Sequence, residues 1–148
     1  GFGNAGVHLP HGMSYPVSGM VRSFVPEGYP PQRPLVPHGM SVILTAPAVF
    51  RWTAEADPAR HLEAARLLGA ETRGAAPADA GEILAGELIR IKQRDGMPSG
   101  QAAVGFTEAD IPALVAGTLP QHRVTKLSPR PAGAEDLAAL FRSAMRSW

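Results

Sequence analysis

The chain has 148 residues, with 14 Lys or Arg against 13 Asp or Glu and a formal net charge of +1. This length suits one domain with a hydrophobic core, spanning residues 1–148, and the near-neutral charge argues against nucleic acid or an anionic membrane as a partner. The sequence has no Cys, which excludes disulfides, thiolate catalysis and cysteine-bound metals, so a metal would need His, Asp or Glu ligands. It has no run of about 18 apolar residues, so no membrane-spanning helix is predicted.

The first residues predict that the chain is a piece of a longer protein or a processed form. Gly1-Phe2-Gly3-Asn4 includes no initiator Met and no basic region of a signal peptide. Richness in Ala, Gly, Pro and Arg favours a GC-rich bacterial source, for which we expect a cytoplasmic location. For a eukaryotic source we expect a mitochondrial one.

Gly1, Gly3 and Gly6 match the G-x-G-x-x-G pattern of a dinucleotide-binding turn, and Glu27 lies at about the spacing of the acidic residue that such turns use. The pattern needs a strand before it and an uninterrupted helix after it. No strand precedes Gly1 in this sequence, and Pro10 falls inside the required helix. We therefore reject a nucleotide-binding turn here.

Apolar residues recur at helical spacing along most of the chain, and no segment shows the sustained alternation of a strand, so we predict an all-α helical bundle. Asp57-Pro58 is a typical helix start and Gly69 a typical stop. The predicted helices after residue 56 span 57–69, 78–93, 110–118 and 134–146.

Proline shapes the prediction for the first third of the chain. Residues 4–21 suit an interrupted helix that Pro10 and Pro16 bend, and Pro47 should kink or end a helix that begins near His38. Residues 22–36 are predicted to form an irregular loop, and loops of this length within a domain are often functional. Five residues that interrupt regular structure fall in it, namely Pro26, Gly28, Pro30, Pro31 and Pro34.

Three of the five histidines lie in the first 38 residues, and two of them begin identical tripeptides, His11-Gly12-Met13 and His38-Gly39-Met40. His8 and His11 share a face if the helix is continuous, although Pro10 lies between them. Imidazole is a suitable ligand for iron or zinc. Two ligands do not complete a catalytic site, because such sites usually take three protein ligands and an open position.

Around these residues the sequence resembles the iron-containing (group III) alcohol dehydrogenases, and within them the hydroxyacid–oxoacid transhydrogenase branch. The resemblance rests on Gly6-Val7-His8-Leu9-Pro10-His11-Gly12-Met13-Ser14-Tyr15-Pro16 and Pro37-His38-Gly39. It continues in Leu44-Thr45-Ala46-Pro47-Ala48-Val49-Phe50, Ala102-Ala103-Val104-Gly105, Asp110-Ile111-Pro112-Ala113-Leu114-Val115 and Ser128-Pro129-Arg130-Pro131.

The resemblance implies that the chain is the C-terminal part of the helical metal domain. It implies that His11 and His38 are the last two of three His ligands, with an Asp as the fourth, and that the metal is Fe²⁺, with Zn²⁺ as a second candidate. The Asp, the remaining His and the α/β domain that binds NAD(P) would lie upstream of residue 1. The implied substrates are a small alcohol or a hydroxyacid and oxoacid pair, such as 4-hydroxybutyrate and 2-oxoglutarate, and the implied assembly is a homo-oligomer.

Other polar residues have less specific expectations. Tyr15 stands where many relatives have a His near the nicotinamide; it would orient substrate or cofactor, or serve as a half-buried core residue. We interpret His8 as pocket lining and expect His61 and His122 to be solvated. Arg130 would bind a carboxylate or form an ion pair in the C-terminal tail.

The leading hypothesis is therefore part of a metal-dependent, NAD(P)-linked alcohol dehydrogenase that is inactive by itself. The alternative is a non-catalytic helical module that associates with a partner chain. In either case we expect an exposed apolar patch that drives self-association or docking to the missing N-terminal half. Its expected members are Val7, Met13, Met20, Met40 and Ile43.

Overall fold

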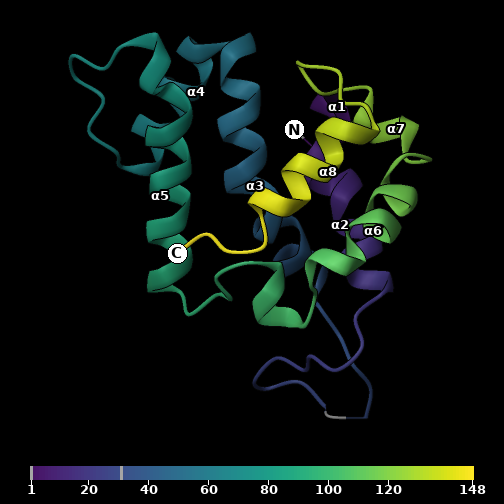
Figure 1. The fold of residues 1–148 in the computed structure, drawn as a ribbon. Coiled ribbons are helices and arrows are strands. Elements are labelled where there is room, and N and C mark those ends of the chain that lie inside the picture. The colour runs from purple at the N-terminus through teal and green to yellow at the C-terminus, as the bar shows by residue number, and fades with distance from the viewer. Residues whose placement is uncertain (1, 31) are drawn as a thin grey trace.

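The all-α prediction is confirmed by the computed structural model, which describes residues 2–30 and 32–148 and contains no β-strand within them. The helices of at least two turns are α2 (Leu9–Gly19), α3 (His38–Thr53), α4 (Pro58–Leu68), α5 (Ala80–Arg94), α6 (Ile111–Thr118) and α8 (Ala134–Ser143) (Figure 1). Two short α-helices are α1 (Phe2–Ala5) and α7 (His122–Thr125). Four 3₁₀ turns are η1 (Ala54–Ala56), η2 (Pro77–Asp79), η3 (Gln101–Val104) and η4 (Glu108–Asp110).

The interruption predicted within residues 4–21 is confirmed and lies between α1 and α2, but Pro10 does not bend a helix there. Gly6 has a φ of 74°, in the left-handed region that glycine adopts without strain. Pro10 then lies in the first turn of α2, where a missing N–H costs no helical hydrogen bond. Pro10 therefore starts α2, and only Pro16 lies inside it.

Pro47 does not end α3, which continues to Thr53. Proline removes one backbone hydrogen bond of a helix interior. Here that loss is offset by burial, because every residue from Leu44 to Val49 is buried. Tertiary packing of this segment outweighs the local preference of proline.

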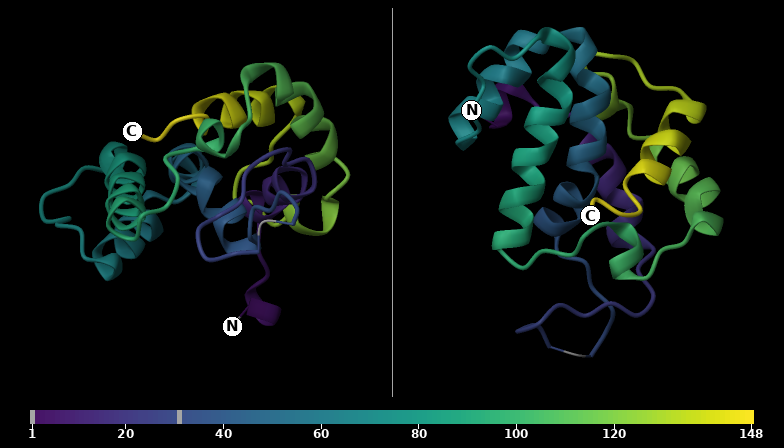
Figure 2. Two further views of the ribbon diagram at one scale, coloured as in Figure 1. Left: turned by 90° about the horizontal axis from the view of Figure 1, so that it is seen from below. Right: turned by 60° about the vertical axis from the view of Figure 1, so that its left-hand side comes forward.

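Helix α3 is the central element of the fold and contacts α2, α5 and α8. Helices α4 and α5 pack together on one side of α3, whereas α2, α6 and α8 lie on the other (Figures 1 and 2). The hydrophobic core lies between α3 and the second of these groups, and its residues include Leu9, Met13, Leu44, Val49, Leu114, Leu137 and Phe141. None of the described helices is both long enough and apolar enough to cross a membrane.

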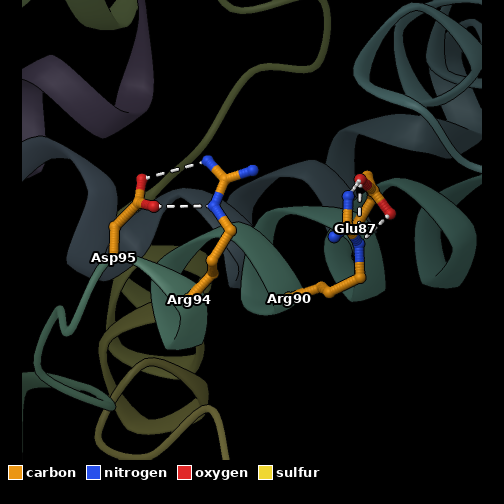
Figure 3. Close-up of polar contacts among 4 residues, drawn as sticks. All are labelled: Glu87, Arg90, Arg94 and Asp95. Carbon is orange, nitrogen blue, oxygen red and sulfur yellow. Dashed lines mark hydrogen bonds and ion pairs between the residues drawn. The ribbon is translucent and has the colours of Figure 1, made fainter.

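The predicted boundaries of α4 are confirmed by its hydrogen bonds. The Asp57 carboxylate accepts a hydrogen bond from the Arg60 backbone N–H at 3.0 Å, and Gly69 has a left-handed φ of 109°. The Gly69 end of α4 faces α5, where the nearly buried Glu87 forms an ion pair with Arg90. A second pair, between Arg94 and its neighbour Asp95, lies one turn further along α5 (Figure 3).

The described residues of the 22–36 loop form neither helix nor strand, and the loop projects beyond the helices at one end of the molecule (Figure 1). It is attached at both ends. Arg22 forms an ion pair with Asp110 at 2.7 Å, and the Leu35 N–H donates to the Phe24 carbonyl at 2.8 Å. Val36, the last residue of the loop, is buried in the core.

The predicted apolar patch is only partly present. Met13 is fully buried in the core, so its inclusion in the patch is wrong: the turn of α2 that carries it faces inward. The other four members of the predicted patch are partly buried, and Met20 and Met40 pack against the core. Met40 and Ile43 line a hollow of about 750 Å³ between the 22–36 loop, α3 and the end of α5.

Candidate metal centre

The fold brings together the two histidines of the repeated tripeptide. His11 lies in the first turn of α2, and His38 is the first residue of α3. Their ring centroids are 5.3 Å apart, and the ring planes are tilted by 57°. Two imidazoles that are 27 positions apart in sequence (38 − 11) are thus neighbours in space.

The repeat extends by one residue, to His-Gly-Met-Ser, and both copies make the same local hydrogen bond. The Ser14 hydroxyl donates to the His11 carbonyl, and the Ser41 hydroxyl donates to the His38 carbonyl, each at 2.7 Å. Both serines are fully buried. Both copies thus have the same local backbone interaction beside the imidazole, which was not predicted from the sequence.

The two rings are spaced as they would be around one shared metal ion. With a metal–nitrogen distance of about 2.1 Å and a tetrahedral angle, two imidazole centroids lie about 5 Å apart, close to the observed 5.3 Å. Burial lowers the pKa of His11, and the nearby His38 lowers it further. A lower pKa favours the neutral imidazole, which is the form that binds a metal. The donor set fits a borderline ion such as Fe²⁺ or Zn²⁺.

The pair does not form a complete coordination shell from this chain. Among the residues that the structure describes, no three His, Asp or Glu side chains are grouped so that they could hold an ion. The geometry therefore fits part of a metal site, to which other ligands would have to be added.

His8 is the N-cap residue of α2, three positions before His11. Its ring meets Phe50 edge to face, with centroids 5.9 Å apart, and it lines a hollow of about 220 Å³ together with His61 and Arg60. Burial lowers the pKa of His8, and the charges of His11 and His61 add to this. Its Nδ1 atom is buried without a hydrogen-bond partner among the described residues. These contacts agree with a pocket-lining role.

The expectation that His61 is solvated is wrong, whereas His122 is exposed at the start of α7 as expected. One ring nitrogen of His61 is 2.9 Å from the Thr53 hydroxyl, and the other is 2.8 Å from the Asp57 carbonyl. His61 therefore joins α4 to the end of α3. The charged and exposed neighbours of His61 in the sequence, Arg60 and Glu63, concealed this.

Tyr15 lies four residues after His11 on α2, so the two side chains share one face of the helix. The Tyr15 hydroxyl accepts a hydrogen bond from Arg123 Nη2 at 3.1 Å. The Arg123 guanidinium carbon also lies 5.7 Å from the centroid of the Tyr15 ring. Arg123 was not predicted from the sequence. The available signal is that residues 111–134 contain no Asp or Glu, so Arg123 has no acidic neighbour in the sequence.

Arg130 forms the tail ion pair, the second of its two expected roles. Its Nη1 is 2.7 Å from Glu55 Oε2 and donates to the Trp52 carbonyl at 3.1 Å. Its guanidinium lies 4.2 Å from the Trp52 ring centroid. These contacts fasten the segment before α8 to the end of α3.

Comparison with known proteins gives consistent relatives along the whole chain. The family described as "Fe-containing alcohol dehydrogenase family, C-terminal" matches residues 1–145. Mitochondrial hydroxyacid-oxoacid transhydrogenases from Pongo abelii and Homo sapiens are 59% and 58% identical over 146 residues. In both cases the alignment covers 99% of this chain and 31% of the relative. A probable mitochondrial hydroxyacid-oxoacid transhydrogenase from Dictyostelium discoideum is 50% identical over 146 residues. This alignment covers 98% of this chain and 27% of the relative.

Two solved structures have the same fold. A 1,3-propanediol oxidoreductase superposes with a TM-score of 0.75 and 24% identity, covering 91% of this chain and 32% of that protein. An alcohol dehydrogenase from Oenococcus oeni superposes with a TM-score of 0.78 and 23% identity, covering 93% of this chain and 32% of that protein. The chain thus spans about a third of the length of the proteins that it matches.

Proposed function

Because this chain belongs to the Fe-containing alcohol dehydrogenase family, whose C-terminal region matches residues 1–145, we propose that it is the helical metal-binding domain of a longer NAD(P)-linked oxidoreductase. In this proposal residues 1–148 form one domain. His11 and His38 are two ligands of an iron ion, and the remaining ligands and the nucleotide-binding fold belong to the other two thirds of the enzyme.

The observation that carries the proposal is the convergence of His11 and His38. Their 5.3 Å separation puts one ion in reach of both imidazoles, and the backbone carbonyl of each His accepts a hydrogen bond from a buried serine three residues on. Because both ligands sit on helices packed against each other, their spacing is fixed before the metal binds.

When bound, the iron would supply Lewis-acid polarisation of an alcohol or carbonyl oxygen, and the nicotinamide would supply the hydride acceptor or donor. The chain contributes the surroundings of that oxygen. His11 and His38 present two imidazole rings, and Tyr15 presents a phenol one helical turn from His11. We assign to Tyr15 the orientation of the substrate.

For the substrate, we propose a hydroxyacid as hydride donor and an oxoacid as acceptor. This finer assignment is supported by identities of 50–59% to proteins named hydroxyacid-oxoacid transhydrogenase. These relatives are named as mitochondrial, so we propose mitochondria as the location for a eukaryotic source and the cytoplasm for a bacterial one.

The test is hydride exchange by the full-length protein that contains this chain. Loaded with Fe²⁺ and one equivalent of NAD, it should convert 4-hydroxybutyrate and 2-oxoglutarate into 4-oxobutyrate and 2-hydroxyglutarate without net NADH. The 148-residue chain alone should be inactive, and mixing it with the separately produced N-terminal portion should restore turnover. Turnover by the chain alone would contradict the proposal, as would an inactive full-length protein.

A further inference from the structure

Helix α7, which carries Arg123, packs against α2, which carries His11. The contact is close at Gly12, the residue after His11, where an added Cβ would lie 2.8 Å from the Thr125 methyl group. Only glycine lets α7 approach α2 this closely without a shift of Thr125. The segment that carries Arg123 is therefore held against the turn that carries His11.

Tyr15 links Arg123 to the face of α2 on which His11 lies. Helical side chains lean toward the N-terminus, so the Tyr15 ring covers the turn that begins at His11. The Arg123 guanidinium donates to the Tyr15 hydroxyl at 3.1 Å and lies 5.7 Å from the ring centroid. Both contacts hold the Arg123 guanidinium near the face of α2 that carries Tyr15 and His11.

The positive charge of Arg123 is not balanced by a carboxylate. Arg22 is paired with Asp110 and Arg130 with Glu55, but within residues 2–30 and 32–148 no Asp or Glu forms an ion pair with Arg123. Residues 111–134 contain no acidic residue at all. A guanidinium has five N–H donors, and the side-chain hydrogen bond of Arg123 in this structure is the one to Tyr15.

We propose that Arg123 binds the carboxylate of the substrate and is the residue by which the enzyme prefers hydroxyacids to neutral alcohols. This rests on the proposed function. The guanidinium fork matches a carboxylate in two parallel hydrogen bonds, a match that lysine does not make. Tyr15 acts through Arg123 as a positioning residue, because its hydroxyl and ring orient the fork.

The decisive measurement is the preference of the full-length enzyme for 4-hydroxybutyrate over the uncharged 4-hydroxybutyramide, as a ratio of kcat/KM values. Hydrogen bonds to a charged group are worth about 1.5–3 kcal/mol, so Arg123→Gln should lower this ratio by roughly 10-fold to 100-fold. The kcat/KM for the amide should change by less than about 3-fold. Arg123→Lys, which keeps the charge without the fork, should give an intermediate ratio.

Lys126→Gln is the matched control, because Lys126 is exposed and lies three residues further along the same segment. It should leave the ratio unchanged. An equal loss in Lys126→Gln would overturn the assignment in favour of a general positive potential. An equal loss of acid and amide turnover in Arg123→Gln would overturn it in favour of a purely structural contact with Tyr15.

Calorimetric binding of butyrate separates this inference from the proposed function, because it needs no turnover. Arg123→Gln should weaken butyrate binding to the full-length protein by roughly 10-fold to 100-fold. This holds even if the wild-type enzyme fails to exchange hydride. Unchanged butyrate affinity in Arg123→Gln would overturn the inference while leaving the dehydrogenase assignment intact.

Discussion

Replacing Lys92 by Met should change how the stability of the chain depends on pH. The Lys92 side chain lies at the C-terminal end of α5 and is only 1% exposed. Its ammonium group donates to the Ser99 carbonyl at 2.8 Å and to the Ser147 hydroxyl at 3.3 Å, and lies 5.0 Å from the Trp148 ring centroid. Among the described residues no carboxylate forms an ion pair with it.

Burial lowers the pKa of Lys92 from 10.5 to about 8. Between these values the unfolded chain binds a proton that the folded chain does not, so the free energy of unfolding rises with pH. A difference of about 2.5 between the two pKa values corresponds to about 3 kcal/mol. This gain in the free energy of unfolding is complete above pH 10.5. It is lost as the pH falls from 10.5 to about 8.

The assay is urea unfolding of wild type and Lys92→Met, followed by circular dichroism at a series of pH values. Met has a similar length and no titrating group, so the difference between the two proteins isolates Lys92. Relative to the variant, wild type should gain about 3 kcal/mol between pH 8 and pH 10.5. Parallel pH profiles would refute the reasoning, because they would mean that the ammonium group is hydrated in the folded chain.

Two further predictions concern packing. Gly81→Ala should destabilise the fold by about 1–3 kcal/mol, because the new Cβ would lie 2.9 Å from a backbone carbonyl of α3. The control Gly86→Ala, in the same helix with no atom within 4 Å, should stabilise by up to about 1 kcal/mol; thermal unfolding distinguishes the two. Arg130→Ala should lower the free energy of unfolding by about 1–2 kcal/mol, because it removes the contact with Trp52. Glu55→Ala should lower it by less than about 1 kcal/mol, because that carboxylate is exposed. Similar losses for the two variants in urea unfolding would contradict this order.

The sequence was sufficient to predict helix ends where the interactions are between residues close together in the chain. Asp57, Pro58 and Gly69 define α4 because a cap, a first-turn proline and a left-handed glycine act within a few residues. Of the two outcomes predicted at Pro47, the end of the helix is wrong, because α3 continues to Thr53. There the preference of one residue competes with the burial of a whole segment, and burial depends on helices that are distant in sequence.

The candidate site was predictable in its ligand pair but not in its surroundings. The repeated His-Gly-Met tripeptide and the resemblance pointed to His11 and His38, and the fold brings them together. Arg123 was missed because its contact with Tyr15 spans 108 positions. The burial of Lys92 was missed for the same reason, since it depends on Ser147 in the C-terminal tail, which returns to α5 (Figure 1).

The central claim is that His11 and His38 are metal ligands and that His8 is not. The most direct test is the iron content of the full-length protein, measured by elemental analysis in the wild type and in His11→Ala, His38→Ala and His8→Ala. Losing one of the protein ligands should sharply reduce the bound iron in the first two variants. His8→Ala should keep at least about half of it, because its ring packs on Phe50 instead. Wild-type iron content in His38→Ala would contradict the account.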